Sequence, residues 1–260
     1  MLRVEGLRKR YGRFDAVRGL DFELRPGEVF GFLGPNGAGK TTTMRMITGL
    51  IEPSEGRITI DGHDLARAPE AAKAITGFIP DRPYVYEKLT AFEFLDFVGG
   101  LHGMRWAEIA ARGAELLETF ALGEWADSLI ESFSHGMKQR LVFCAALLPR
   151  PKLLVVDEPM VGLDPRGAKL VKHLFRDLCR DGELTVFLST HTLEVAEEVC
   201  DRIAILRRGE IVAMGTMQEL RARAEREDSD LESIFLQLTE PESAASDRDL
   251  GATARPRSTP

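Results

Sequence analysis

The sequence predicts an α/β fold with a parallel core sheet, an antiparallel β layer near the N-terminus and an inserted α-helical subdomain. The core prediction rests on four short apolar segments separated by helical stretches. Such segments are typical of strands that are buried on both faces by helices. The four segments are Val29 to Leu33, Leu153 to Val156, Thr185 to Leu188 and Arg202 to Leu206.

The antiparallel layer is predicted from three early strand-like segments that Gly, Pro and Asp turn signals separate. They are Leu2 to Leu7, Phe14 to Leu24 and Arg57 to Ile60. Short segments joined by such turns favour antiparallel pairing over the buried parallel arrangement.

The helical subdomain is predicted where strand signals disappear, from Ala91 to Leu148. Apolar residues recur there at helical spacing. We therefore expect a domain over residues 1–215 with a helical insertion at about 89–150, a short helical extension over 216–239, and a disordered tail over 240–260 that is rich in Pro, Ser, Ala and charge. The apolar residues are Phe94, Leu95, Val98, Ile109, Leu116, Leu117 and Phe120.

Composition limits the function classes. Of 260 residues, 44% are hydrophobic and 29% are charged, which is typical of a soluble globular protein. The net charge of -7 argues against nucleic acid as the main partner. Three scattered cysteines and a start without a hydrophobic signal region favour a reducing cytoplasm, and the longest apolar run, Leu141 to Leu148, is too short to cross a bilayer.

The segment GPNGAGKT matches the pattern GxxxxGK[ST], follows a predicted strand and precedes a helical pattern. Its glycines let backbone N–H groups point at phosphate oxygens, and the following helix adds its positive end. We therefore expect Lys40 to reach the β and γ phosphates of ATP, Thr41 to bind Mg²⁺, and Thr42 to contact a phosphate. The alternative is a plain glycine turn. The loop residues are Gly34, Pro35, Asn36, Gly37, Ala38, Gly39, Lys40 and Thr41.

The segment LLVVDEP delivers two carboxylates to the carboxyl end of a predicted buried strand. Asp157 is the candidate Mg²⁺ ligand, and Glu158 is the candidate general base for the attacking water. Alone, the segment could equally be a strand that ends in acidic residues. Together with the glycine-rich loop, it predicts a P-loop NTPase with a RecA-like parallel core that hydrolyses MgATP.

The segment FSHGMKQR is a small-residue turn that leads into a helix predicted to begin near Met137. Ser134 and Gly136 would lie near a helix N-terminus, which suits an anion. Taken alone, Ser134 is most simply a helix cap.

In order, GPNGAGKT, FSHGM before KQR, LLVVDEP, GLDP at Gly162 to Pro165 and STH at Ser189 to His191 resemble the ATP-binding cassette (ABC) family, over roughly Leu2 to Gly215. The resemblance implies a head-to-tail dimer, most simply of identical copies, that closes around two ATP. In that dimer Ser134 and Gly136 would act on the ATP of the other copy.

Three further residues match family positions. Tyr11 matches the aromatic residue that stacks on adenine, although a lone Tyr in an early loop is also typical of a surface. His191 matches the switch histidine that contacts the γ phosphate and holds the catalytic geometry with Glu158; otherwise it would cap a strand end. Leu163 and Asp164 match the loop that crosses the dimer interface.

Two departures from the family pattern alter expected contacts. Asp81 stands where the family usually has glutamine, so it could bind Mg²⁺ but cannot donate an amide proton. His135 and Met137 replace a glycine and the glutamine of the usual LSGGQ signature. Ser134 and Gly136 still match the family signature, so we expect the main mechanism to be retained.

The closing segment, Leu231 to Thr239, resembles cassette subunits of bacterial ABC-2-type export systems whose permease is a separate chain. It implies a peripheral protein on the cytoplasmic face of the membrane. We expect the stretch from Arg82 to Phe97, with Tyr84 and Tyr86 exposed, to meet the permease.

Two other classes remain as alternatives. A soluble cassette ATPase acting on ribosomes or DNA would normally show tandem cassettes or a long coiled coil, and this chain shows neither. A binding module without turnover is disfavoured because Lys40, Asp157, Glu158 and His191 are all present. The transported substance cannot be read from this chain.

Overall fold

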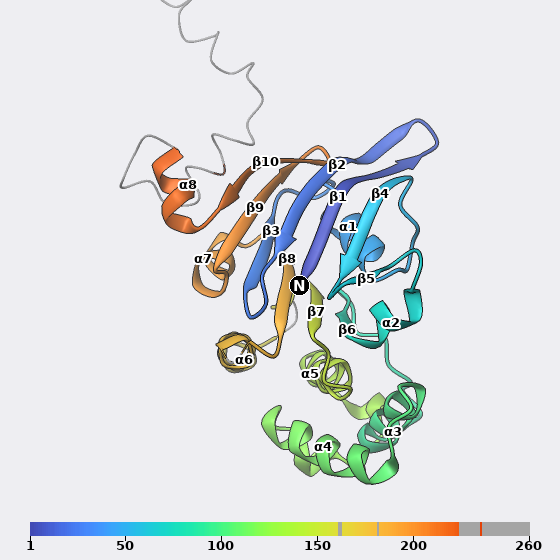
Figure 1. The fold of residues 1–260 in the computed structure, drawn as a ribbon. Helices are drawn as coiled ribbons and strands as arrows, with labels where there is room; N and C mark the ends of the chain where they lie inside the picture. The colour runs from blue at the N-terminus through green and yellow to red at the C-terminus, as the bar shows by residue number, and fades with distance from the viewer. Residues whose placement is uncertain (161–162, 181, 224–234, 236–260) are drawn as a thin grey trace, which may run out of the picture.

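The computed structural model describes residues 1–160, 163–180, 182–223 and 235, and it has the α/β architecture that the sequence predicts. A six-stranded, largely parallel sheet lies beside a four-stranded antiparallel sheet, and a group of helices extends from one end (Figure 1). The predicted fold class is therefore confirmed.

The antiparallel sheet has the strand order β2-β1-β4-β5. Strand β1 (Leu2–Tyr11) pairs with β2 (Phe14–Leu24) on one side and with β4 (Glu55–Ile60) on the other, and the short β5 (His63–Asp64) adds to β4. Buried and exposed residues alternate over much of β1 and β2, as expected for a sheet with one face on the core.

The six-stranded sheet has the order β10-β9-β3-β8-β7-β6. Strands β3 (Val29–Leu33), β7 (Leu153–Asp157) and β8 (Thr185–Thr190) are buried at every residue and lie side by side in parallel. Strands β6 (Thr76–Ile79) and β9 (Arg202–Arg207) flank them, also in parallel, whereas β10 (Glu210–Gly215) is antiparallel to β9. The carboxyl ends of the parallel strands therefore meet at one edge.

Helices cover the sheets and form the insertion. Between β6 and β7 lie α3 (Ala91–Leu101), α4 (Trp106–Thr119), two 3₁₀ turns (Gly123–Trp125 and Ile130–Ser132) and α5 (His135–Leu147). The remaining helices are α1 (Lys40–Ile47), α2 (Pro69–Ala74), α6 (Pro165–Arg180), α7 (Leu193–Val199) and α8 (Met217–Arg223).

Helix α5 begins two residues before the predicted start at Met137. The reason is local, because the Ser134 hydroxyl accepts a hydrogen bond from the Met137 N–H and so caps the first turn. The predicted extension over 216–239 begins with α8, and residues 224–234 and 236–260 lie outside the described part of the chain.

Four phenylalanine rings join the two sheets. Phe22 comes from β2, Phe30 and Phe32 from β3, and Phe187 from β8. The centroids of the Phe32 and Phe187 rings are 4.7 Å apart, and those of Phe22 and Phe32 are 5.0 Å apart. Because Phe32 lies two residues before the glycine-rich loop, this cluster fixes the strand from which the loop leaves.

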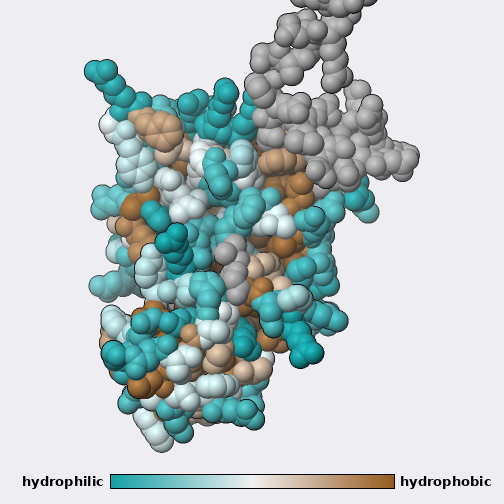
Figure 2. All heavy atoms as spheres, turned by 180° about the vertical axis from the view of Figure 1, so that it is seen from behind, coloured by the Kyte–Doolittle hydropathy of each residue, from teal (hydrophilic) through white to brown (hydrophobic). Residues whose placement is uncertain are grey.

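On the face shown in Figure 2, hydrophilic residues surround several separate apolar patches. Such a surface is ordinary, since folded proteins expose much apolar area. In the described residues, no helix combines the length and the apolar character that crossing a membrane requires.

The three cysteines are free thiols within the core. Burial raises the pKa of each, that of Cys179 to about 12. Because the thiolate is the reactive form, a raised pKa means slow reaction near neutral pH.

We expect the folded protein at pH 8 to leave a thiol reagent almost unconsumed over minutes, whereas protein unfolded in guanidinium reacts at all three cysteines. Rapid labelling of the folded chain would contradict this packing.

Candidate functional site

The glycine-rich loop, Gly34 to Gly39, joins the end of β3 to the start of α1. Helix α1 begins at Lys40, and its N-cap residue, Gly39, has a left-handed φ of 108° and offers no side-chain cap. The first N–H groups of the helix are thus available to an anion.

Close packing explains two of the glycines in this loop. A Cβ on Gly34 would lie 2.6 Å from the backbone oxygen of Leu206, and one on Gly39 would lie 2.8 Å from that of Ala16. The positive φ of Gly39 adds a second reason for glycine. The loop is therefore held against the end of β9 and the beginning of β2.

Lys40 points back into the loop. Its ammonium donates hydrogen bonds to the backbone oxygens of Gly34, at 2.6 Å, and Pro35, at 3.4 Å. Burial lowers the pKa of Lys40, and the nearby carboxylates of Glu158 and Asp157 partly oppose that shift. A cation enclosed by backbone amides and close to two carboxylates suits a phosphate group with an associated metal ion.

Asp157 ends β7 and pairs in register with Ser189 on β8. The Ser189 hydroxyl donates a hydrogen bond to Asp157 Oδ1, and the Asp157 residue is only 3% exposed. This contact leaves Oδ2 of the carboxylate for another ligand. This role of Ser189, which the sequence shows only as part of the STH motif, was not predicted, although its place at the end of an adjacent strand was a usable signal.

Glu158 and His191 also lie at this edge of the sheet. Glu158 has a left-handed φ of 54°, and its N–H donates to the backbone oxygen of Ser189 at 3.1 Å. His191 Nδ1 and Glu158 Oε1 share a hydrogen bond of 2.8 Å. A left-handed residue other than glycine costs roughly 1–3 kcal/mol and is typical of functional sites. The predicted Glu158–His191 pair is therefore in contact.

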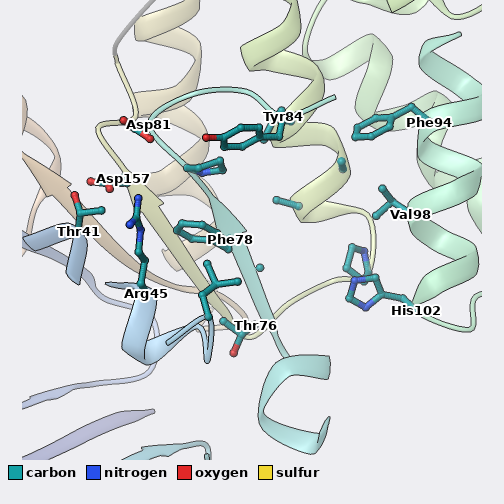
Figure 3. A pocket seen from close by; sticks show the side chains of 17 residues that line it. Thr41, Arg45, Thr76, Phe78, Asp81, Tyr84, Phe94, Val98, His102 and Asp157 are labelled. Carbon is teal, nitrogen blue, oxygen red and sulfur yellow. The ribbon is translucent and has the colours of Figure 1, made fainter. Parts of the chain in front are cut away.

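Thr41, Asp81 and Asp157 line one cavity of about 490 Å³ between the core and the helical insertion (Figure 3). Hydroxyl and carboxylate oxygens are ligands that Mg²⁺ accepts. The described residues contain no group of three His, Cys, Asp or Glu that could hold a metal ion alone. A cation that these oxygens share with the phosphates of a nucleotide fits a MgATP site. Thr42 follows Thr41 in the first turn of α1, and its side chain makes no hydrogen bond within the described part of the chain.

Ser134 and Gly136 lie at the N-terminus of α5. Neither is among the described residues that line that cavity. The Ser134 hydroxyl acts as a helix cap, with 3.3 Å between its oxygen and the Met137 nitrogen. Ser134 and His135 are exposed. Within one copy the structure therefore leaves this segment open to another molecule.

Two other predicted residues lie elsewhere. Tyr11 ends β1, is 49% exposed and has Lys9 Nζ 5.4 Å from its ring centroid. Asp164 precedes α6, where its Oδ1 accepts a hydrogen bond of 2.7 Å from the Gly167 N–H. Leu163 packs partly on the core, whereas Gly162 lies outside the described residues.

A glycine-rich loop between a buried strand and a helix, beside two acidic strand ends, defines a P-loop nucleotide-binding protein. The family model described as "ABC transporter" matches residues 17–161. A second model, described as "AAA domain, putative AbiEii toxin, Type IV TA system", matches residues 126–197. The chain belongs to the ABC transporter ATP-binding family and is an ATPase.

Named relatives support that assignment. The chain is 42% identical to the linearmycin resistance ATP-binding protein LnrL of Bacillus subtilis (strain 168), over 86% of this chain and 71% of the relative. It is 40% identical to the daunorubicin/doxorubicin resistance ATP-binding protein DrrA of Streptomyces peucetius, over 85% and 67%. The resemblance to ABC-2-type export subunits is thereby confirmed at the level of homologues.

Solved structures agree. The structure titled "Structure of ATP binding subunit of ABC transporter" has a TM-score of 0.87 and 34% identity, and the match covers 92% of this chain and 100% of that chain. A dimeric post-hydrolysis state of the cassette MJ0796 bound to ADP and Pi has a TM-score of 0.76 and 25% identity, with coverage of 84% and 99%. ATP binding by this chain follows from its family.

The Ser189–Asp157 contact generates a stability prediction. We expect Ser189→Ala to lower the free energy of unfolding by about 1–3 kcal/mol, because it leaves a buried carboxylate without its hydroxyl donor. Urea unfolding measures the change. Ser132→Ala is the matched control, since it removes an exposed hydroxyl that bonds only to the Leu129 backbone oxygen. Equal stability of the two variants would contradict the assigned contact.

Proposed function

We propose that this chain is the MgATP-hydrolysing subunit of an ABC exporter, and that two copies close head-to-tail around two nucleotides to drive a separately encoded membrane permease. The ATP-binding domain of this subunit comprises residues 1–215 and includes the helical insertion at about 89–150. The names of its relatives, which include Nod factor export ATP-binding proteins as well as resistance proteins, support export as the direction.

Nucleotide binding is assigned to the loop and its surroundings. The backbone from Gly34 to Gly39 and the side chains of Lys40, Thr41 and Thr42 hold the phosphates, and Tyr11 stacks on adenine. The position of Lys40 inside the loop supports this assignment. When bound, Mg²⁺ would neutralise phosphate charge beside Thr41, Asp157 and Asp81, which line one cavity.

The Glu158–His191 contact is the observation that carries the proposed hydrolysis. Glu158 takes a proton from the attacking water, and His191 orients Glu158 and donates to the γ phosphate. The 2.8 Å hydrogen bond and the low exposure of the Glu158 side chain, 15%, support a fixed carboxylate. General-base catalysis of this kind contributes roughly 10²–10⁴-fold to the rate.

The second copy completes each site in this proposal. Ser134, Gly136 and Asp164 bind across the interface. Support comes from the exposure of Ser134 and Asp164 and from the separation of Ser134 and Gly136 from the Thr41 cavity. Closing the two copies would bring the exposed N-terminus of α5 of one copy, with Ser134 at its cap, onto the γ phosphate held by the other.

The permease surface is proposed at the mouth of the same cavity, on the cytoplasmic face of the membrane. Tyr84, Tyr86 and Phe97 are 76%, 60% and 43% exposed. Tyr86 and Phe97 lie edge to face with their centroids 5.3 Å apart. Exposed aromatic groups beside a cavity are typical of protein contacts.

Replacing two charged residues separates binding from turnover. We expect Glu158→Gln to keep nucleotide affinity, to lower turnover at least about 10²-fold and to accumulate a dimer with ATP, because only the base is lost. Lys40→Ala should instead lose nucleotide binding. Fluorescent-nucleotide titration, phosphate release and size-exclusion chromatography measure these effects. Turnover at the parent rate in Glu158→Gln would show that Glu158 is not the base.

The permease proposal is tested by cross-linking in membranes. Because the native thiols are buried, Tyr84→Cys supplies one accessible thiol. We expect it to cross-link to a polytopic membrane protein that mass spectrometry identifies. Val212→Cys, on the opposite edge strand of the six-stranded sheet and 38% exposed, is the control. Recovery of ribosomes, DNA or nothing, with the protein wholly soluble, would contradict the transport proposal.

A further inference from the structure

Arg45 is a residue of α1 that takes no part in the proposed nucleotide contacts. It follows Thr41 by four positions, so the two side chains lie on the same face of the helix, one turn apart. Both line the cavity that also contains Asp81 and Asp157. Figure 3 shows the Arg45 side chain extending from α1 towards these two carboxylates.

The two carboxylates share one edge of the sheet because their strands are parallel neighbours. Ile79 at the end of β6 pairs with Val156 on β7. Asp157 directly follows Val156 as the last residue of β7, whereas Asp81 lies two residues beyond the end of β6. The two strands are about 4.8 Å apart, so both carboxylates emerge at the same edge. They therefore place two negative charges on the side of the cavity that faces Thr41.

The charges at this edge are compensated unequally. Asp157 accepts a hydrogen bond from Ser189 and is buried. Asp81 is exposed, and its side chain has no hydrogen-bond or ion-pair partner among the described residues. Of the described residues that line the cavity, Arg45 is the only Arg or Lys. An arginine of this kind attracts a nearby carboxylate and so weakens the attraction of that carboxylate for a metal cation in the same space.

We propose that Arg45 is a positioning residue that restrains the Asp81 carboxylate by charge attraction and thereby limits how strongly the site holds a divalent cation. This inference rests on the proposed MgATP site. It explains how a carboxylate serves at position 81, because Arg45 offsets the extra negative charge. A merely solvated Arg45 would have no effect that depends on Asp81.

A double-mutant cycle distinguishes a positioning role of Arg45 from a merely solvated side chain. Arg45→Met removes the charge and keeps an unbranched apolar stem, and Asp81→Asn removes the other charge at nearly constant shape. Arg45→Lys keeps the positive charge and should behave as the parent protein. Arg180→Met is the matched control, because Arg180 lies at the far end of α6 and is exposed.

The readout is Mn²⁺ affinity of the full chain saturated with a non-hydrolysable ATP analogue, followed by the electron paramagnetic resonance signal of free Mn²⁺. We expect Arg45→Met to tighten Mn²⁺ binding about tenfold and Asp81→Asn to weaken it. In the Asp81→Asn background, we expect Arg45→Met to change the affinity less than about twofold. Arg180→Met should leave it unchanged.

Each other result has a defined meaning. An unchanged affinity in Arg45→Met, or the same change in both backgrounds, would overturn the inference. Thermal unfolding of each variant shows whether it is folded; if Arg45→Met is not, Arg45→Gln takes its place in the cycle. If the parent protein with the analogue holds Mn²⁺ no better than the analogue alone, the proposed metal site itself fails.

Discussion

Parallel pairing of β3, β8, β7 and β6 is the constraint on which the site depends. Because parallel strands run in the same direction, the residues that follow them all emerge at one edge of the sheet. The glycine-rich loop, Asp81, Asp157 and His191 come from four such strand ends. Residues more than 150 positions apart in the chain therefore contribute to one site without any long loop having to fold over it. The phenylalanine cluster then holds β3 and β8 against the antiparallel layer.

Electrostatic balance explains why these groups coexist at one edge. Lys40 is buried with its ammonium on backbone oxygens, and burial alone disfavours its charged form. Asp157 and Glu158 oppose that penalty, while Ser189 and His191 each bond to one of those carboxylates. Removing one charged member would leave its neighbours poorly compensated, so these residues act as a group. In the proposal for Arg45, the same balance extends to the cavity side of the site.

Much of the fold could be predicted because its signals are local. Buried strands appear as apolar runs, and the loop requires glycines whose close packing on Leu206 and Ala16 the structure shows. The Glu158–His191 contact came from resemblance to a family, and the structure provides its geometry. The hydroxyl bond from Ser189 and the place of Arg45 depend on strand register and side-chain direction, which a single sequence does not display. The predicted Ser134 cap is confirmed, and it places the start of α5 at His135, two residues before the expected start near Met137.

The strained turn at Glu158 connects the fold to the proposed chemistry. Asp157 must face the cavity because it ends the buried strand and pairs with Ser189. An extended residue 158 would place its side chain on the opposite face of the sheet. The left-handed φ breaks that alternation, and the N–H bond to Ser189 together with the His191 contact stabilises the turn. The left-handed φ thus keeps Glu158 from pointing to the opposite face of the sheet. Two adjacent carboxylates can therefore serve one site in two different roles, one as the candidate metal ligand and the other as the candidate base.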